Sequence, residues 1–394
     1  MNHSNRKSQK KFLLATILLL MLFIFLLLIG SEFLLRKIFK ESAASPPQQF
    51  VYSEIFYHNQ PNASWDSINE IGEKVSLQTD SYGLRCQEDC LRNEMDQQVI
   101  VLGDSFVFGE NSQYSKTFVE QINQNLKMKT LRFLNAGVNG YSNHEALILL
   151  RYLYSFLRPK AIFLVVYMGN DLRDAYFLSD KQRIILERTE EASWKQKSNG
   201  VYRYKGLLKK VRENSRIVKL IYNVFQKFRY RDKEEMSDYF LAELEFFKKK
   251  NSVKAIKAIE NVEFTLKHFK NFCNSKKTLC EVVLVPAKSQ VYQDLNYLNK
   301  LNFVDEQNMD SAIKFLQNKD YSFDRPSEIY ASILNKLEIP FLDLTEEFRQ
   351  HKEEKLYGMI DRHWFPKGEE LAAKVMLKRS VVLNKMKQED SGGQ

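Results

Sequence analysis

The sequence predicts a three-layer α/β fold, in which helices cover both faces of a central parallel sheet. From residue 98 onward, short continuous apolar runs bounded by turn residues alternate with amphipathic stretches. Glycine is scarce, yet five of the 14 glycines lie between residues 103 and 169. Glycine serves where the backbone turns tightly or approaches another group closely, so this cluster marks candidate site loops.

Five apolar runs are expected to form the strands of this sheet. They lie at residues 98–103, 131–135, 161–167, 281–286 and 339–344. Amphipathic stretches at 143–157 and 328–337 are expected to be helices that cover it. Because the strands are apolar throughout rather than alternating, both faces of the sheet should be buried.

The composition of the chain predicts a linker, a folded domain with an insertion, and a tail. Residues 35–97, with "SPPQQ", predict a linker and an irregular segment, and the folded domain is expected over 98–384. More than a hundred mostly helical residues separate the third and fourth expected strands, which predicts a helical insertion at about 175–272. Residues 385–394 are polar and are expected to form a disordered tail.

An N-terminal transmembrane helix is expected over residues 12–34. Residues 12–30, "FLLATILLLMLFIFLLLIG", carry no charge, and about 20 apolar residues span a bilayer core. Basic residues within 1–11 place that segment in the cytoplasm, so the body is expected on the extracytoplasmic side, periplasmic or outer. A cleaved signal peptide is the alternative, although its apolar region is usually only about 7–15 residues long.

The positive charge of the chain raises the question of nucleic-acid binding. The net charge is +10, but the sequence contains no zinc-finger spacing and no RNP-like stretch, so nucleic acid is not expected as a partner. The lysine-rich residues 205–277 are interpreted as a solvated helix face.

In an oxidising compartment, Cys86 is expected to bond Cys90, and Cys273 to bond Cys280. No histidine lies near enough to these pairs in sequence to suggest a metal site, and neither a metal nor a cofactor is expected.

Four polar stretches follow expected strands. The first, "VIVLGDSFVFGE" at 99–110, places Ser105 directly after a strand. "NAGVNG" at 135–140 and "MGND" at 168–171 follow the next two strands, and "DRHWFPKG" at 361–368 lies beyond the fifth. Because the carboxyl ends of parallel strands meet at one edge of a sheet, these stretches are expected to form one site.

Together these residues supply what acyl transfer requires. Ser105 is the candidate nucleophile, His363 the base that takes its proton, and Asp361 the group that holds the imidazole in one tautomer. The oxyanion of a tetrahedral intermediate needs preorganised donors. The backbone N–H groups of Ser105 and Gly140 and the side-chain amide of Asn170 are the candidates.

These four stretches, in this order, resemble the SGNH hydrolase superfamily, also called GDSL esterases. The resemblance covers residues 98–171 and 281–376. It implies a flavodoxin-like three-layer sandwich, and it implies the same site residues as the chemistry above.

One branch of that superfamily is especially similar. A single residue, Arg362, separates the aspartate from the histidine, whereas many members have two. This "D-x-H-W" form and "LVPAKSQVY" at 284–292 resemble the branch that includes periplasmic polysaccharide O-acetylation proteins. The N-terminal anchor is also typical of that branch, which implies envelope polysaccharide-modifying partners. "DSYGLR" at 80–85 resembles a segment that precedes the serine motif in membrane-anchored members.

Several further residues near these motifs have candidate roles. Asp104 is expected to brace the serine turn and Asp171 to order the loop around Asn170. Arg85 is expected to contact either an acidic group of the substrate or a buried carboxylate. Lys288 is interpreted as a solvated lysine, with contact to an anionic substrate group as the alternative.

Trp364 is interpreted as a packing residue beside the histidine, with a substrate platform as the alternative. His144 and His351 have no partner motif and are interpreted as ordinary surface or packing residues.

The leading hypothesis is a membrane-anchored serine esterase or O-acyltransferase. It would act through an acyl-serine on ester-linked acyl groups of a cell-envelope carbohydrate or lipid. Hydrolysis and transfer share this machinery and differ mainly in how well water is excluded. The alternative is a non-catalytic binding or assembly subunit of an envelope polysaccharide complex. The intact serine, histidine and aspartate argue against that alternative, and covalent labelling of Ser105 discriminates between the two.

Overall fold

The structure is a computed structural model of the chain. It describes residues 50–187, 244–293, 320–358 and 362–391, with gaps at 53–56, 88–89, 91–96, 127 and 129, and a few helical residues between 15 and 31. The chain divides into two units, one of residues 1–45 and 195–237 and the other of residues 46–194 and 238–394. The second unit holds the sheet and the candidate site.

Most of the expected membrane anchor at 12–34, and all of the segment 1–11, lie outside the described residues. Among the residues that are described, no helix is both long enough and apolar enough to cross a bilayer. The anchor therefore stays a prediction.

Five parallel strands form the central sheet, and all five strands predicted from the sequence are confirmed. They are β5 (Gln97–Gly103), β6 (Leu131–Gly137), β7 (Ala161–Tyr167), β8 (Leu279–Val285) and β9 (Phe341–Asp343). Their order in the sheet is β6-β5-β7-β8-β9. The order reverses between β5 and β7, and sheets of this kind bind ligands at the carboxyl ends of the strands beside such a switch point.

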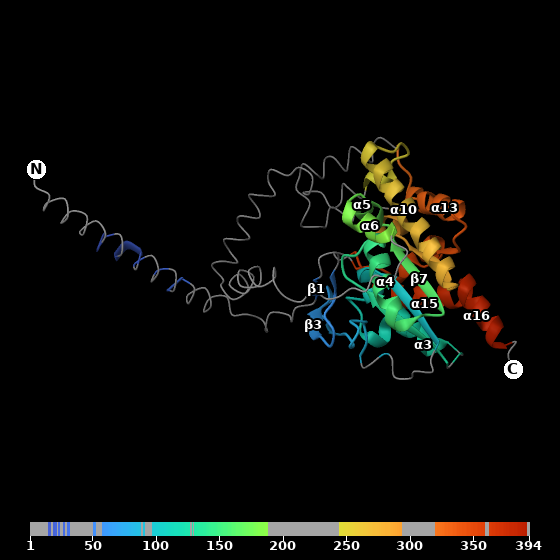
Figure 1. The fold of residues 1–394 in the computed structure, drawn as a ribbon, viewed down its shortest axis with the longest axis horizontal. Helices are drawn as coiled ribbons and strands as arrows, with labels where there is room; N and C mark the ends of the chain where they lie inside the picture. Colours follow the sequence, from blue (N-terminus) through green and yellow to red (C-terminus); the bar gives the residue numbers. More distant parts are fainter. Residues whose placement is uncertain are drawn as a thin grey trace, which may run out of the picture. The chain divides into compact units, whose positions relative to one another are not determined.

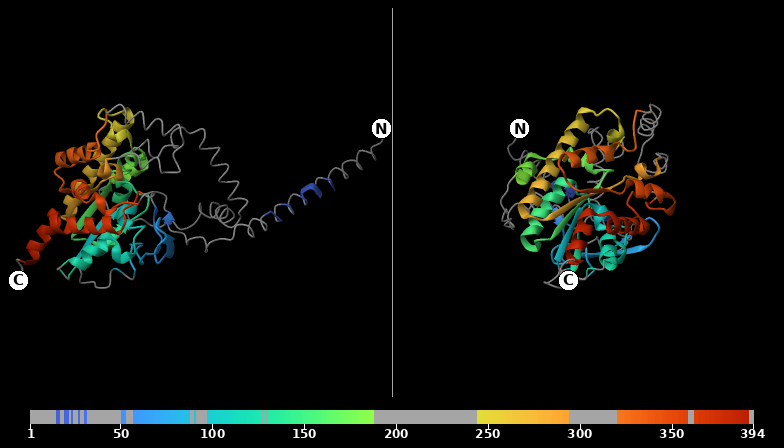
Figure 2. Two further views of the ribbon diagram at one scale, coloured as in Figure 1. Left: turned by 180° about the vertical axis from the view of Figure 1, so that it is seen from behind. Right: turned by 90° about the vertical axis from the view of Figure 1, so that its right-hand side faces the viewer.

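Helices cover both faces of the sheet, which confirms the three layers (Figures 1 and 2). One apolar core joins the sheet to α4 (Asn143–Leu157), α10 (Val253–Lys276) and α13 (Arg325–Lys336). The other core joins it to α3 (Phe118–Asn125), α15 (Pro366–Arg379) and α16 (Val381–Ser391). The helices expected at 143–157 and 328–337 are α4 and α13.

Part of the helical insertion expected at about 175–272 is a helix of the three-layer sandwich itself. Helix α10 falls within that range, but it buries Val262, Leu266 and Phe269 in the core that it shares with α4. It therefore serves as the crossover helix before β8. Residues 188–243, the middle of the expected insertion, lie outside the described residues.

The prediction that residues 35–97 are irregular is wrong for part of that segment. Two antiparallel hairpins form there, β1 (Phe50–Tyr52) with β2 (Tyr57–Asn59) and β3 (Ser64–Ile68) with β4 (Lys74–Gln78). These strands have only three to five residues, too few for a clear alternating pattern. Contacts with the main domain hold them, such as the bond from the side-chain amide of Asn59 in β2 to the Gly137 carbonyl at 2.9 Å.

The prediction of a disordered tail from residue 385 is wrong through residue 391. Helix α16 continues to Ser391 and buries Met386 completely. Buried Glu281 of β8 holds the start of this helix, where its carboxylate accepts bonds from Ser380 Oγ at 2.5 Å and from Val382 N–H at 3.1 Å. Burial raises the pKa of the Glu281 carboxyl.

Replacing Glu281 with alanine is expected to lower the free energy of unfolding by about 2 kcal/mol, because it leaves buried donors unsatisfied. Glu389→Ala is the control, since Glu389 is exposed on the same helix and pairs with Lys160 at the surface. Its change should stay below about 0.5 kcal/mol. Urea unfolding measures both variants, and equal effects would show that Glu281 does not anchor α16.

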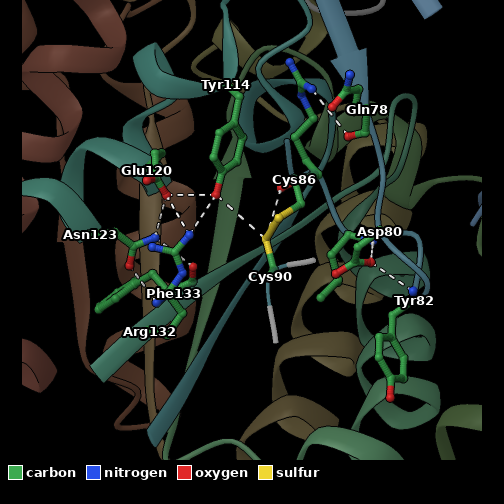
Figure 3. The surroundings of a disulfide bond; sticks show 12 residues. Gln78, Asp80, Tyr82, Cys86, Cys90, Tyr114, Glu120, Asn123, Arg132 and Phe133 are labelled. Carbon is green, nitrogen blue, oxygen red and sulfur yellow. Dashed lines mark hydrogen bonds and ion pairs between the residues drawn. A yellow bond between two sulfur atoms is a disulfide. The ribbon is translucent and has the colours of Figure 1, made fainter. Parts of the chain in front are cut away.

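Both predicted disulfides are confirmed, Cys86–Cys90 and Cys273–Cys280. The first faces Tyr114, whose hydroxyl lies 3.8 Å from Cys90 Sγ and donates to Glu120 at 2.8 Å (Figure 3). Among the described residues, Asp80, Cys86 and Cys90 form the one group of possible metal ligands within reach of each other. The disulfide removes both thiolates from that group, so it is not a metal site.

Candidate active site

The first strand of the sheet ends in the turn that presents Ser105. After Gly103, Asp104 caps the short helix α2 (Ser105–Phe108), and its carboxylate accepts the N–H of Phe106 at 2.9 Å. Gly109 ends this helix with a φ of +71°, a left-handed conformation that favours glycine. The next three residues of the helix are buried, whereas Ser105 itself is half-buried at the edge of the sheet.

Gly137 fixes how closely the serine turn packs on β6. A Cβ at Gly137 would lie 2.3 Å from the backbone nitrogen of Phe108 and 2.8 Å from the carbonyl carbon of Val107. Any larger residue would therefore push α2 away from the sheet. The side-chain amide of Asn135 adds a bond to the Val107 carbonyl at 2.6 Å.

His363 is held on the segment before α15. Gly358 N–H donates to the His363 carbonyl at 3.0 Å, and Phe365 N–H to the Leu356 carbonyl at 2.8 Å. The imidazole ring packs against Phe106, with ring centroids 5.1 Å apart. These contacts place His363 Nε2 at 2.6 Å from Ser105 Oγ, which is the hydrogen-bonded distance between a nucleophile and its base.

Trp364, the next residue, is buried among the rings of Phe106, Phe118 and Phe348 at centroid distances of 5.3, 5.6 and 5.9 Å. It packs beneath the histidine, as expected of a packing residue, and offers no face to a substrate. Asp361 lies outside the described residues, so its role as the orienting carboxylate stays a prediction.

The three candidate oxyanion donors, Ser105, Gly140 and Asn170, lie after β5, β6 and β7. Gly140 is exposed in a turn with a φ of +79°, and Asn170 starts α5 (Asp171–Ala175). Within the described part of the chain, no hydrogen bond uses the N–H groups of Ser105 or Gly140 or the side-chain nitrogen of Asn170. No described residue therefore occupies these three donors, and each can donate to a substrate oxygen.

Replacing Asn170 with alanine is expected to lower turnover about a hundredfold with little change in KM, because an oxyanion donor contributes on the order of 3 kcal/mol in the transition state. Asn170→Asp should be at least as damaging, since it places a negative charge beside a developing one. Steady-state kinetics with one ester test both variants. Near wild-type turnover in Asn170→Asp would show that Asn170 only shapes the turn.

Two buried carboxyl groups lie on the turns that follow β5 and β7. Burial raises the pKa of Asp104 to about 6. Burial, together with the charge of Asp104, raises the pKa of Asp171 well above its usual range. The carboxylate of Asp171 accepts the Tyr167 N–H at 2.9 Å, so each acid bonds the backbone of its own turn. This geometry fits bracing of the two turns.

Arg85 cannot contact a substrate from its observed position. Its side chain is 1% exposed and donates to the carbonyls of Ser76 at 3.0 Å and Ser112 at 3.3 Å. It also lies over the ring of Phe108, at 5.3 Å from the centroid. Burial lowers its pKa to about 10, and the nearby Glu369 opposes that shift. The segment "DSYGLR" thus packs behind the serine turn.

Lys288 is not a solvated lysine, because it is only 8% exposed and donates to the Gly358 carbonyl at 2.6 Å. It supports the segment that carries His363 rather than facing a substrate anion. His144 is buried beside Ser142, and burial lowers its pKa to about 4. His351 bonds the Glu347 carbonyl at 2.9 Å. Both histidines lie outside the serine–histidine pair.

Two residues that no sequence motif singles out also support the site. Glu369 is fully buried behind the serine turn, where it accepts the Phe118 N–H at 2.7 Å, and burial raises its pKa to about 8. Tyr57 donates to the carbonyl of Asn139, next to Gly140. Glu369 falls on the amphipathic helix after the histidine motif, but nothing in the sequence pattern marks Tyr57.

No family model and no curated protein matches the sequence. Among solved structures, the chain is similar to the acetyl xylan esterase AlAXEase at 12% identity and a TM-score of 0.36, covering 71% of this chain and 97% of that one.

A lipolytic G-D-S-L family protein from Veillonella parvula DSM 2008 is similar at 15% identity and a TM-score of 0.33, covering 72% and 97%. The lipase/acylhydrolase from Enterococcus faecalis is similar at 10% identity and a TM-score of 0.36, covering 72% and 94%. At this level of similarity the matches assign no activity to the chain, so its function is inferred from the site itself.

Proposed function

We propose that the protein is a serine esterase or O-acyltransferase of the SGNH type. The observation that carries the proposal is the 2.6 Å hydrogen bond between His363 Nε2 and Ser105 Oγ at the carboxyl edge of the sheet. Free donors on the two neighbouring loops complete a site for acyl transfer. An intact nucleophile–base pair also favours an enzyme over a non-catalytic subunit.

The reaction follows from this geometry. Ser105 Oγ attacks the ester carbonyl carbon while His363 Nε2 accepts the hydroxyl proton. The oxyanion then lies against the N–H groups of Ser105 and Gly140 and the amide of Asn170. The ester oxygen leaves with the proton from His363, and an acyl-serine remains. Water or an acceptor hydroxyl then gives its proton to His363 and attacks the acyl carbon. The bond from that carbon to Ser105 Oγ breaks, and His363 returns the proton to Ser105 Oγ.

We further propose that the body acts on an acylated carbohydrate or lipid outside the cytoplasm, anchored by residues 12–34. The uncharged apolar run at 12–30 supports the anchor. The two disulfides support an oxidising compartment, since such bonds are rare where thiols are kept reduced. Envelope polysaccharide-modifying proteins are the proposed partners.

The test uses the full chain in detergent micelles, with Ser105→Ala as the matched control. A panel of nitrophenyl esters from acetyl to long-chain acyl is supplied with and without an oligosaccharide acceptor. Release of acid indicates hydrolysis, and an acylated oligosaccharide detected by mass spectrometry indicates transfer. If neither product exceeds the Ser105→Ala background for any ester, the proposed function is wrong.

A further inference from the structure

A residue outside the central sheet, Tyr57 of β2, fixes the orientation of the peptide group between Asn139 and Gly140. Val138–Tyr141 form a β-turn in which Tyr141 N–H donates to the Val138 carbonyl at 3.2 Å. Gly140 occupies the third position with a φ of +79°, as a type II turn requires. A type I turn would rotate the central peptide by roughly half a revolution and point the Gly140 N–H the other way.

Tyr57 of β2 bonds this same peptide group. Its hydroxyl donates to the Asn139 carbonyl at 3.0 Å. The described residues contain no cis peptide bond, so the Asn139 carbonyl and the Gly140 N–H point in opposite directions. The tyrosine therefore holds the carbonyl on the side of the hairpin and turns the N–H away from it.

Further contacts fix β2 against the loop. Asn59, two residues along and so on the same face of the strand, donates to the Gly137 carbonyl at 2.9 Å. The Tyr57 ring packs edge-on against the ring of Tyr141, at 5.0 Å between centroids, and the Tyr141 hydroxyl donates to the Tyr57 carbonyl. A Cβ at Gly140 would lie 3.1 Å from the Tyr57 hydroxyl, so the tyrosine also presses close to the loop.

We propose that Tyr57 is a positioning residue for the oxyanion site, a role that rests on the proposed function. Its hydrogen bond keeps the turn in the form that exposes the Gly140 N–H. The bond also polarises the shared peptide, which strengthens that N–H as a donor. The hairpin outside the sheet thereby contributes to transition-state stabilisation without touching the substrate.

The test compares Tyr57→Phe with Tyr141→Phe. The first keeps the aromatic ring and removes the bond from its hydroxyl to the Asn139 carbonyl. The second removes another hydroxyl bond between the same hairpin and loop, but none to the central peptide. Tyr57→Phe should lower kcat about tenfold with KM within about twofold. Tyr141→Phe should keep kcat within about twofold in the folded fraction, even where the melting temperature falls.

A second readout does not depend on activity. Glycine labelled with ¹⁵N and asparagine labelled with carbonyl ¹³C give signals only from the two Asn-Gly pairs of the sequence, 139–140 and 199–200. Asn199→Asp removes one signal and so assigns the other. Tyr57→Phe should shift the Gly140 amide signal upfield, because the carbonyl of the same peptide loses its hydrogen bond, and Tyr141→Phe should shift it less.

An unshifted Gly140 signal, or a shift without loss of kcat in an active enzyme, would overturn the role of Tyr57 alone. An inactive wild type would instead overturn the proposed function, and the role of Tyr57 with it. A shifted signal together with a tenfold lower kcat, in Tyr57→Phe and not in Tyr141→Phe, is the result that the proposal requires.

Discussion

Replacing Ser105 with alanine is expected to lower ester turnover by at least about a thousandfold, because no acyl-serine can form. The side chain is small and half-buried at the end of the sheet, so the fold and the melting temperature should be preserved. Initial rates on a nitrophenyl ester measure the effect. Ser155→Ala is the control, since its exposed hydroxyl bonds only within α4, and it should match the wild type.

Turnover above about one tenth of the wild-type rate in folded Ser105→Ala would remove Ser105 from the reaction. The preserved fold can be checked by the melting temperature. Non-reducing peptide mapping should separately find both disulfides formed in the wild type and in the variant.

Replacing His363 with asparagine is expected to lower turnover to a similar extent and to change its pH dependence. In the wild type, only a neutral imidazole can accept the Ser105 proton, and an ordinary imidazole titrates near about pH 6.5. Turnover should therefore rise between about pH 5 and pH 8. The residual rate of His363→Asn should lack this rise.

His351→Asn is the matched control, because that imidazole bonds a backbone carbonyl in α14 (Thr345–Gln350) and is not part of the serine–histidine pair. Its pH profile should match the wild type. A wild-type profile that is flat from acid to neutral pH, with an active His363→Asn, would exclude His363 as the base.

The sheet could be predicted from the sequence because its strands are continuous apolar runs. Strand β7, for example, is buried at all seven residues, so its own run of apolar residues is enough to predict it. The hairpins between residues 50 and 78 could not be predicted, since their short strands depend on contacts with the main domain. Helix α16 looks polar in the sequence, but Glu281, about a hundred residues earlier, anchors its start.

The site motifs could also be predicted, because each follows a strand directly. The contacts that surround the charged residues could not be predicted from the sequence. Whether Lys288 is solvated depends on the Gly358 carbonyl, 70 residues away, and whether Arg85 reaches a substrate depends on the packing of β4 and the loop at Ser112 over it. Tyr57 acts across 82 residues of sequence, a contact that no local pattern encodes.

Labelling with a fluorophosphonate tests the central claim, an activated serine at position 105, most directly. The full chain is incubated with the reagent and digested, and the modified residue is located by mass spectrometry. A single adduct on Ser105 is predicted, formed as Oγ displaces fluoride from phosphorus, with none in Ser105→Ala and much slower formation in His363→Asn. An adduct elsewhere, no adduct, or labelling of Ser105 at an unchanged rate without His363 would contradict it.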